Sequence, residues 1–235
     1  MKNNRQGFFM KLYIIKDMTN GELGKQIHEK TLLLNKVLDN TTAAFELMRS
    51  QARNIMEYMS GEYPDEFEFE DRNHNEFEIR FGSDILVFMM HTNVFEFSRY
   101  HEVMRLPYIQ QDKNRSFCGM INIYNFLTDS FDYNRDYDLG YLIGRVFINM
   151  DNHYFVEGKR EVGFLYSNFN TSLISEESTA DIVRSAMEYA NNFDLLTPPF
   201  DDVKEISVGE IRTTAASKGK ITAKRLGFEF QQDKE

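Results

Sequence analysis

The chain has 235 residues, of which 42% are hydrophobic, so it can bury a substantial core as one large domain or two small ones. Its formal net charge of −10 disfavours nonspecific binding to nucleic acids, whose backbones are also negative. The single cysteine, Cys118, excludes an intramolecular disulfide and a thiolate metal cage built from one chain, as is typical of proteins of the reducing cytoplasm.

Residues 1–19 begin with a basic residue and an apolar run, which together resemble the start of a signal peptide. Lys11 interrupts the run, and no cleavage pattern of small residues follows it. No window of the chain reaches the ~18 consecutive apolar residues that a membrane-spanning helix requires. We therefore expect a soluble cytoplasmic protein that has no membrane partner.

Residues 20–59 contain no proline and are rich in helix-forming residues. They predict one long helix, or two helices that meet near residues 39–42, where short polar side chains compete for backbone hydrogen bonds. One unbroken helix would be roughly 60 Å long at ~1.5 Å per residue, which is longer than a single domain of this size needs.

A stripe of mainly apolar residues follows the helical period through this segment. Two interpretations are open: the stripe packs against a second copy of the chain, or the helix lies across the chain's own sheet. The candidate residues for self-association are Leu23, Ile27, Leu34, Val37, Met48 and Ile55.

After Pro64 the hydrophobic period changes from that of a helix to that of a strand. Residues 67–70 and 76–81 alternate Phe or Ile with charged residues, which predicts a hairpin with one face in the core and an acidic face in water. Residues 85–90 are apolar on both faces and predict a central strand, and residues 117–126 predict another strand.

The segments 139–150 and 153–166 flank Asp151 and Asn152, whose side chains favour a tight turn, so they predict a second antiparallel pair. Ser175 is a candidate N-cap for a C-terminal helix, and an apolar stripe follows it as far as Phe193. Beyond Pro199 the chain becomes polar.

This order of elements predicts an α+β fold with a long N-terminal helix or two helices, a central mainly antiparallel sheet, a C-terminal helix and a polar tail. The expected organisation is an N-terminal segment at residues 1–19, a single α+β domain at 20–200, and a polar, partly basic segment at 201–235.

Glu157 and Lys159 are the sharpest catalytic candidates. Residues two positions apart on a strand share a face, and metal-dependent nucleases combine such a Glu and Lys with an Asp. A two-residue turn would pair Val146 with Glu157 and direct Arg145 to the other face, and in that register the hairpin supplies no Asp for a metal. The favoured interpretation is therefore a strand with a charged interruption, and the nuclease site is the alternative.

The remaining motifs indicate no cofactor. The five histidines form no close ligand pair, and no phosphate-binding glycine loop is present, so we predict no metal and no cofactor. A basic stretch near the C-terminus is a candidate for binding an acidic protein surface or, against the overall charge, nucleic acid; a solvated tail is the simpler interpretation. Its basic residues are Lys218, Lys220, Lys224 and Arg225.

These features together predict a non-catalytic intracellular interaction module that forms a homo-oligomer or binds a protein partner. The first alternative is a metal-dependent nuclease or phosphodiesterase that uses the Glu-x-Lys strand. The second is a small-molecule sensor, because twelve methionines and many aromatic residues can line an adaptable pocket as well as fill a core.

Overall fold

The computed structural model describes residues 19–158, 168–193 and 199–209. Within these residues a seven-stranded antiparallel sheet has the strand order β1-β2-β3-β5-β6-β7, and the short strand β4 also pairs with β5. The strands are β1 Phe67–Asn73, β2 Glu76–Phe81, β3 Asp84–Met90, β4 Phe95–Glu96, β5 Phe117–Leu127, β6 Tyr141–Asn149 and β7 Tyr154–Gly158. The α-helices are α2 Asn20–Glu62, α3 Pro107–Gln111, α4 Thr128–Asp132, α6 Glu176–Asn191 and α7 Phe200–Val203.

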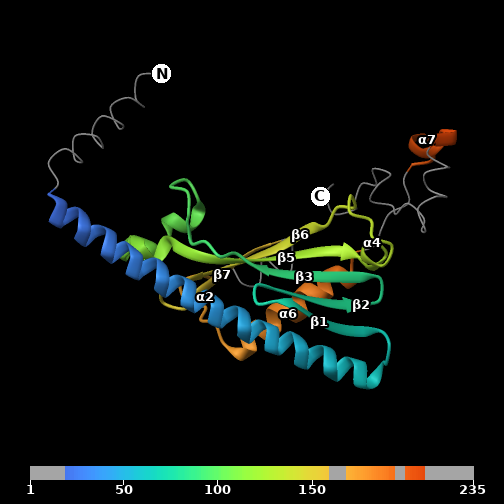
Figure 1. Ribbon diagram of the computed structural model, residues 1–235, viewed down its shortest axis with the longest axis horizontal. Helices are drawn as coiled ribbons and strands as arrows, with labels where there is room; N and C mark the ends of the chain where they lie inside the picture. Colours follow the sequence, from blue (N-terminus) through green and yellow to red (C-terminus); the bar gives the residue numbers. More distant parts are fainter. Residues whose placement is uncertain (1–18, 159–167, 194–198, 210–235) are drawn as a thin grey trace.

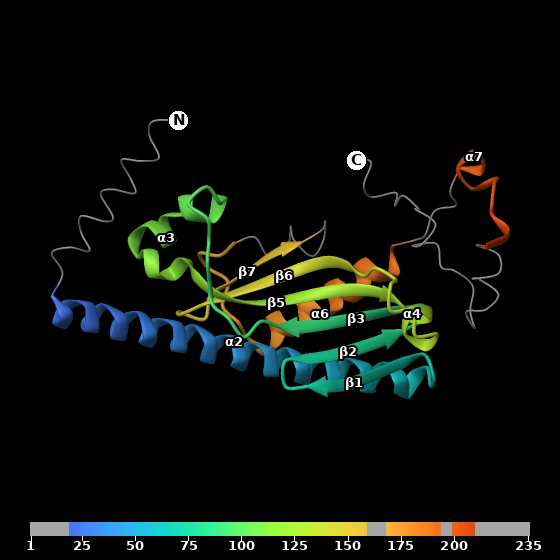
Figure 2. The same ribbon diagram turned by 45° about the horizontal axis from the view of Figure 1, so that its top comes forward.

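The two long helices, α2 and α6, cover one face of the sheet, and α3 with its flanking 3-10 turns covers one end of the other face (Figures 1 and 2). The predicted α+β fold is therefore confirmed, with its long N-terminal helix, antiparallel sheet and C-terminal helix. Within the part of the chain that the structure describes, no helix combines the length and apolar character that crossing a bilayer demands.

Helix α2 is one continuous helix of 43 residues, which settles the choice between one helix and two. Thr19 and Glu22 form a capping box at its N-terminus. The polar residues near the middle do not break it, because the hydroxyls of Thr41 and Thr42 donate to the carbonyls of Val37 and Leu38 one turn earlier.

The middle of α2 lies unusually close to the centre of the sheet. A Cβ atom placed on Gly119 of β5 would lie 2.0 Å from Oγ1 of Thr41 and 2.7 Å from its Cβ, so only glycine fits there. Asn40 fastens the same turn of α2 by donating to the carbonyls of Asn149 and Met150 at the end of β6. Near the other end of α2, Arg49 donates to the carbonyls of Asn73 and His74 in the β1–β2 turn.

The candidate self-association residues divide between two environments. Val37, Met48 and Ile55 are buried in the chain's own core, and Leu34 is half-buried. Every residue from Thr19 to Leu32 is exposed, including Leu23 and Ile27, and Figure 1 shows this part of α2 extending beyond the sheet. We call residues 20–32 the overhang; whether a second copy covers it stays a prediction.

The β1–β2 hairpin follows the predicted alternation, with Phe77, Ile79 and Phe81 in the core. One residue of its acidic face is buried rather than in water. Glu78 is only 2% exposed, because Arg72 on β1 covers it and donates to it at 3.0 Å. This hydrogen bond to Glu78 is the main reason why the pKa of Arg72 is raised.

The predicted register of the β6–β7 pair is wrong by one residue. Val146 pairs with Val156, and Arg145 pairs with Glu157. The reason is the side chain of Asn149, whose Oδ1 accepts hydrogen bonds from the N–H groups of Asp151 and His153. These bonds close a three-residue turn at residues 150–152, so every cross-strand partner shifts.

The contact between Thr41 and Gly119 predicts that Gly119→Ala destabilises the protein. The added methyl group forces α2 away from the sheet, and such overpacking costs about 1–3 kcal/mol of the free energy of unfolding. Urea denaturation measures the loss. The control is Gly24→Ala on the overhang, where a Cβ has open space and alanine favours the helix. Equal stability of Gly119→Ala and the wild-type chain would contradict this packing.

Candidate functional site

An apolar cavity lies on the face of the sheet opposite α2, and we call it the open-face pocket. Its volume is about 310 Å³. It is lined by Phe95, Glu96, Phe97, Ser98, His101, Cys118, Met120, Arg145, Phe147 and Glu157.

Strand alternation builds the floor of the open-face pocket. Cys118 and Met120 flank Gly119 on β5, so they face away from α2. Phe147 of β6 is the cross-strand partner of Met120 and completes the floor. All three side chains are at most 9% exposed, so the floor is apolar and held in place by packing.

A wall of aromatic rings stands on this floor. The short strand β4 pairs with the start of β5 and brings Phe95 beside Cys118. The ring of Phe97, just after β4, lies 4.9 Å from the Phe147 ring and 4.6 Å from the His101 ring, measured between centroids. Rings at these separations attract one another through their edges and faces, which fixes the shape of the wall.

An ion pair between Arg145 of β6 and Glu157 of β7 forms the polar rim. The two are direct cross-strand partners, and each side chain is about 40% exposed. The Arg145 guanidinium also lies 5.6 Å from the centre of the Phe147 ring, a cation–π contact that ties the rim to the floor.

One further polar side chain, His101, completes the rim on the side of β4. Glu96 of β4 also lines the pocket, but it pairs with Phe117 and alternates with Phe95, so its side chain is directed to the other face of the sheet. His101 caps the following 3-10 turn, and its Nδ1 accepts a hydrogen bond from the N–H of Val103 at 3.3 Å. The neutral ring therefore carries its hydrogen on Nε2 and is a donor there. The rim thus combines hydrogen-bond donors and acceptors beside an apolar floor.

Cys118 contributes only an apolar surface. Burial raises the pKa of its thiol, so the group stays neutral and a poor nucleophile. Cys118 therefore behaves as a small hydrophobe in the pocket floor.

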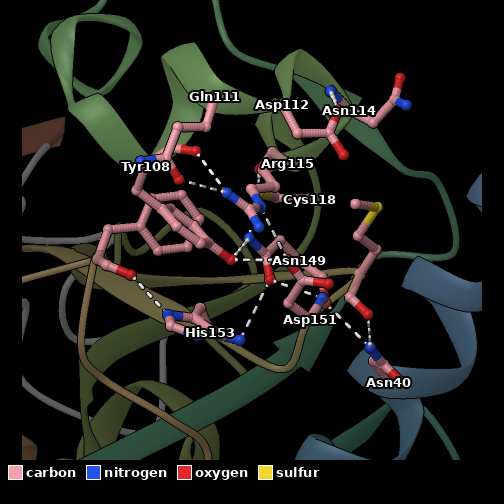
Figure 3. A network of polar contacts seen from close by, with 12 residues as sticks. Asn40, Tyr108, Gln111, Asp112, Asn114, Arg115, Cys118, Asn149, Asp151 and His153 are labelled. Atoms are coloured by element: carbon pink, nitrogen blue, oxygen red, sulfur yellow. Dashed lines mark hydrogen bonds and ion pairs between the residues drawn. The ribbon is translucent and has the colours of Figure 1, made fainter.

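A network of hydrogen bonds holds the α3 segment against the end of the sheet beside the pocket (Figure 3). The Tyr108 hydroxyl donates to Asp151 at 3.1 Å and accepts from Asn149 at 3.0 Å. Arg115 donates to Asp151 at 2.9 Å and to the carbonyl of Tyr108 at 2.9 Å. His153 stacks on the Tyr108 ring, with 4.7 Å between centroids.

This network positions the pocket walls rather than a ligand, because its polar groups bond to one another. It links α3 and its flanking 3-10 turns, η1 Glu102–Arg105 and η2 Lys113–Ser116, to the β6–β7 turn, and through Asn40 it also reaches α2. Burial raises the pKa of Tyr108 to about 12. The neutral hydroxyl is therefore the form that the fold requires.

The candidate nuclease residues have a mixed placement. Glu157 lies at the pocket and is paired with Arg145, the residue that the wrong register directed to the opposite face. Glu96 lines the same pocket, whereas Lys159 lies outside the described residues. Across residues 19–158, 168–193 and 199–209, no three His, Cys, Asp or Glu residues form a group able to hold a metal ion.

The basic candidates also lie outside the described residues; they are Lys218, Lys220, Lys224 and Arg225.

Sequence patterns did not predict three residues of the pocket, which are Phe97, Met120 and His101. Phe95 and Phe97 are two positions apart, so strand alternation puts them on one face, but no local signal places β4 against the start of β5 or His101 above it.

The Tyr108 network predicts a specific loss of stability at alkaline pH. An unfolded tyrosine has a pKa of about 10, whereas the pKa of Tyr108 is about 12 when folded. Its contribution is therefore complete below pH ~10 and is lost as the pH rises from ~10 to ~12.

Tyr108→Phe should lower the free energy of unfolding by about 1 kcal/mol at neutral pH, through the lost hydrogen bonds. It should also flatten the alkaline decline, and urea denaturation at a series of pH values measures both effects. The exposed Tyr137→Phe is the control. An alkaline decline of the same slope in Tyr108→Phe and the wild-type chain would refute this role.

Comparisons with protein-family models, curated proteins and solved structures find no match for this chain. The chemistry of the open-face pocket is therefore the basis for proposing a function.

Proposed function

We propose that this protein is a binding module whose site is the open-face pocket, and that its ligand is a small organic molecule with an apolar body and a polar group. The observation that carries the proposal is the combination of a packed apolar floor, an aromatic wall and a few polar groups at one rim. Small-molecule sites have this composition, and a volume of about 310 Å³ falls within their usual size range.

The floor and wall can contribute binding affinity without a large loss of side-chain conformational entropy. Cys118, Met120 and Phe147 are already buried, and the neighbouring network holds the α3 segment in place. A ligand that covers such a preformed surface gains apolar contact while few side chains lose freedom.

The rim favours a ligand with both donor and acceptor groups. Arg145 offers N–H donors, Glu157 offers acceptors, and His101 offers one N–H. A simple anion would have to compete with Glu157 for Arg145. A neutral polar or zwitterionic group can bond to the rim while the ion pair stays intact.

The metal-dependent nuclease alternative has one observation in its favour, which is that Glu96 and Glu157 line the same pocket. Arg145 already neutralises Glu157, so a divalent ion would have to displace a guanidinium. The binding proposal needs no such displacement and is preferred.

Blocking the pocket mouth tests the binding proposal. N-phenyl-1-naphthylamine is a neutral fluorescent probe with a large apolar body, and we expect saturable binding to the wild-type chain. Ser98→Tyr places a ring at the lining and should weaken that binding at least ~10-fold, which corresponds to about 1.4 kcal/mol.

The matched control for Ser98→Tyr is Arg99→Tyr, because Arg99 is an exposed neighbour that does not line the pocket. Equal affinity of Ser98→Tyr and Arg99→Tyr for the probe would exclude the open-face pocket as the site.

Self-association is a second candidate function, supported by the exposed apolar residues of the overhang, Leu23 and Ile27. An exposed stripe of this kind on a helix is typical of helix–helix packing between chains. Light scattering over a range of concentrations should show a mass that rises toward a dimer.

Ile27→Lys should shift this equilibrium toward the monomer, because it puts a charge in the stripe. His28→Lys adds a lysine on a different face of the helix and should leave the mass unchanged. A wild-type chain that stays monomeric at every concentration would remove this candidate.

A further inference from the structure

A second cavity lies at the other end of β5, on the side of α6, and we call it the end cavity. Its volume is about 450 Å³. It is lined by Glu66, Phe67, Phe81, Gly82, Ser83, Asp84, Asn125, Leu127, Ala190, Asn191 and Phe193. It shares no lining residue with the open-face pocket, so it is a separate feature of the fold.

The end cavity forms where five elements end or begin together. Strand β1 begins and β2 ends at it, β3 starts beside it, and β5 and α6 finish there. Three phenylalanines, Phe67, Phe81 and Phe193, give it an apolar wall. This wall suits an organic body.

The electrostatics of the end cavity favour a positive charge. Glu66 and Asp84 contribute carboxylates, and none of the described lining residues is Lys, Arg or His. Ala190 and Asn191 belong to the last turn of α6, which contains no basic residue. The negative end of the helix dipole is therefore not compensated within that turn.

One buried polar atom of a residue that lines this cavity lacks a partner. Asn125 is only 3% exposed, and its Oδ1 has no hydrogen-bond partner among the residues that the structure describes. An unpaired buried acceptor is costly, and a ligand with an N–H group would satisfy it. This atom gives the site a polar contact that charge alone does not provide.

We infer that the end cavity binds a small organic cation, an ammonium group attached to an apolar body. The ammonium N–H donates to Oδ1 of Asn125 and faces the carboxylates of Glu66 and Asp84, while the body packs against the phenylalanines. Aromatic faces add to the attraction for a cation. The apolar wall suits such an ion better than a hard metal ion, which prefers several oxygen ligands.

Three probes of similar shape and different charge test this inference by isothermal titration calorimetry. They are 2-phenylethylammonium, neutral 2-phenylethanol and anionic 3-phenylpropionate. The cation should bind at least ~10-fold more tightly than the alcohol, and the anion should bind more weakly still. Equal affinity for the cation and the alcohol would overturn the inference.

Two variants of residues that line the end cavity, with one control, test whether the cation binds there. Glu66→Gln should weaken cation binding several-fold, whereas Glu68→Gln, an exposed residue two positions along, should not. Asn125→Leu should reduce cation binding at least ~10-fold and keep or raise the melting temperature, because it removes an unpaired acceptor. If neither lining variant changes the affinity, the cation binds elsewhere and the inference fails.

The open-face pocket is also lined by rings and carboxylates, so cation binding there must be distinguished from binding in the end cavity. Ser98→Tyr blocks that pocket and should leave the affinity for 2-phenylethylammonium unchanged. In NMR spectra the cation should shift the amide signals of Gly82 and Ser83 rather than that of Phe97. Shifts confined to Phe97 and its neighbours would assign the cation to the open-face pocket and overturn the inference.

Discussion

The close approach of Thr41 to Gly119 is the contact on which the rest of the structure depends. Without a side chain at residue 119, the middle of α2 rests directly on the central strand, and Phe45, Met48 and Ala52 can fill the core between α2, α6 and the sheet. The neighbours of Gly119 on β5 point the other way and make the pocket floor. One glycine thus fixes the core on one face and the site on the other.

Much of the fold could be predicted from the sequence, because hydrophobic period is a local property. The long helix, the β1–β2 hairpin, the central strand and the C-terminal helix each follow from a periodic stretch. The two wrong predictions, the β6–β7 register and the exposure of Glu78, have a different origin. The β6–β7 register depends on the side chain of Asn149, which bonds across its own turn, and the burial of Glu78 depends on an arginine of the adjacent strand. The hydrophobic period of the sequence predicts neither of these side-chain hydrogen bonds.

The candidate sites were much less predictable, because their residues are distant in the chain. Glu96, His101, Arg145 and Glu157 come from different strands and a turn, and they share a pocket only because β4 and β6 both pair with β5. Asn125 resembles any polar residue near a strand end until the structure shows that its Oδ1 is buried and unpaired. The Glu157 and Lys159 pattern drew attention to the correct strand, but Arg145 was the missing partner.

The overhang is continuous with the part of α2 that is held to the sheet. Residues 20–32 extend roughly 20 Å at ~1.5 Å per residue, while the next turns are clamped to the sheet through Asn40 and Thr41. The clamp lies on the strand that carries Cys118 and Met120 on its other face, so the long helix and the pocket floor share one strand.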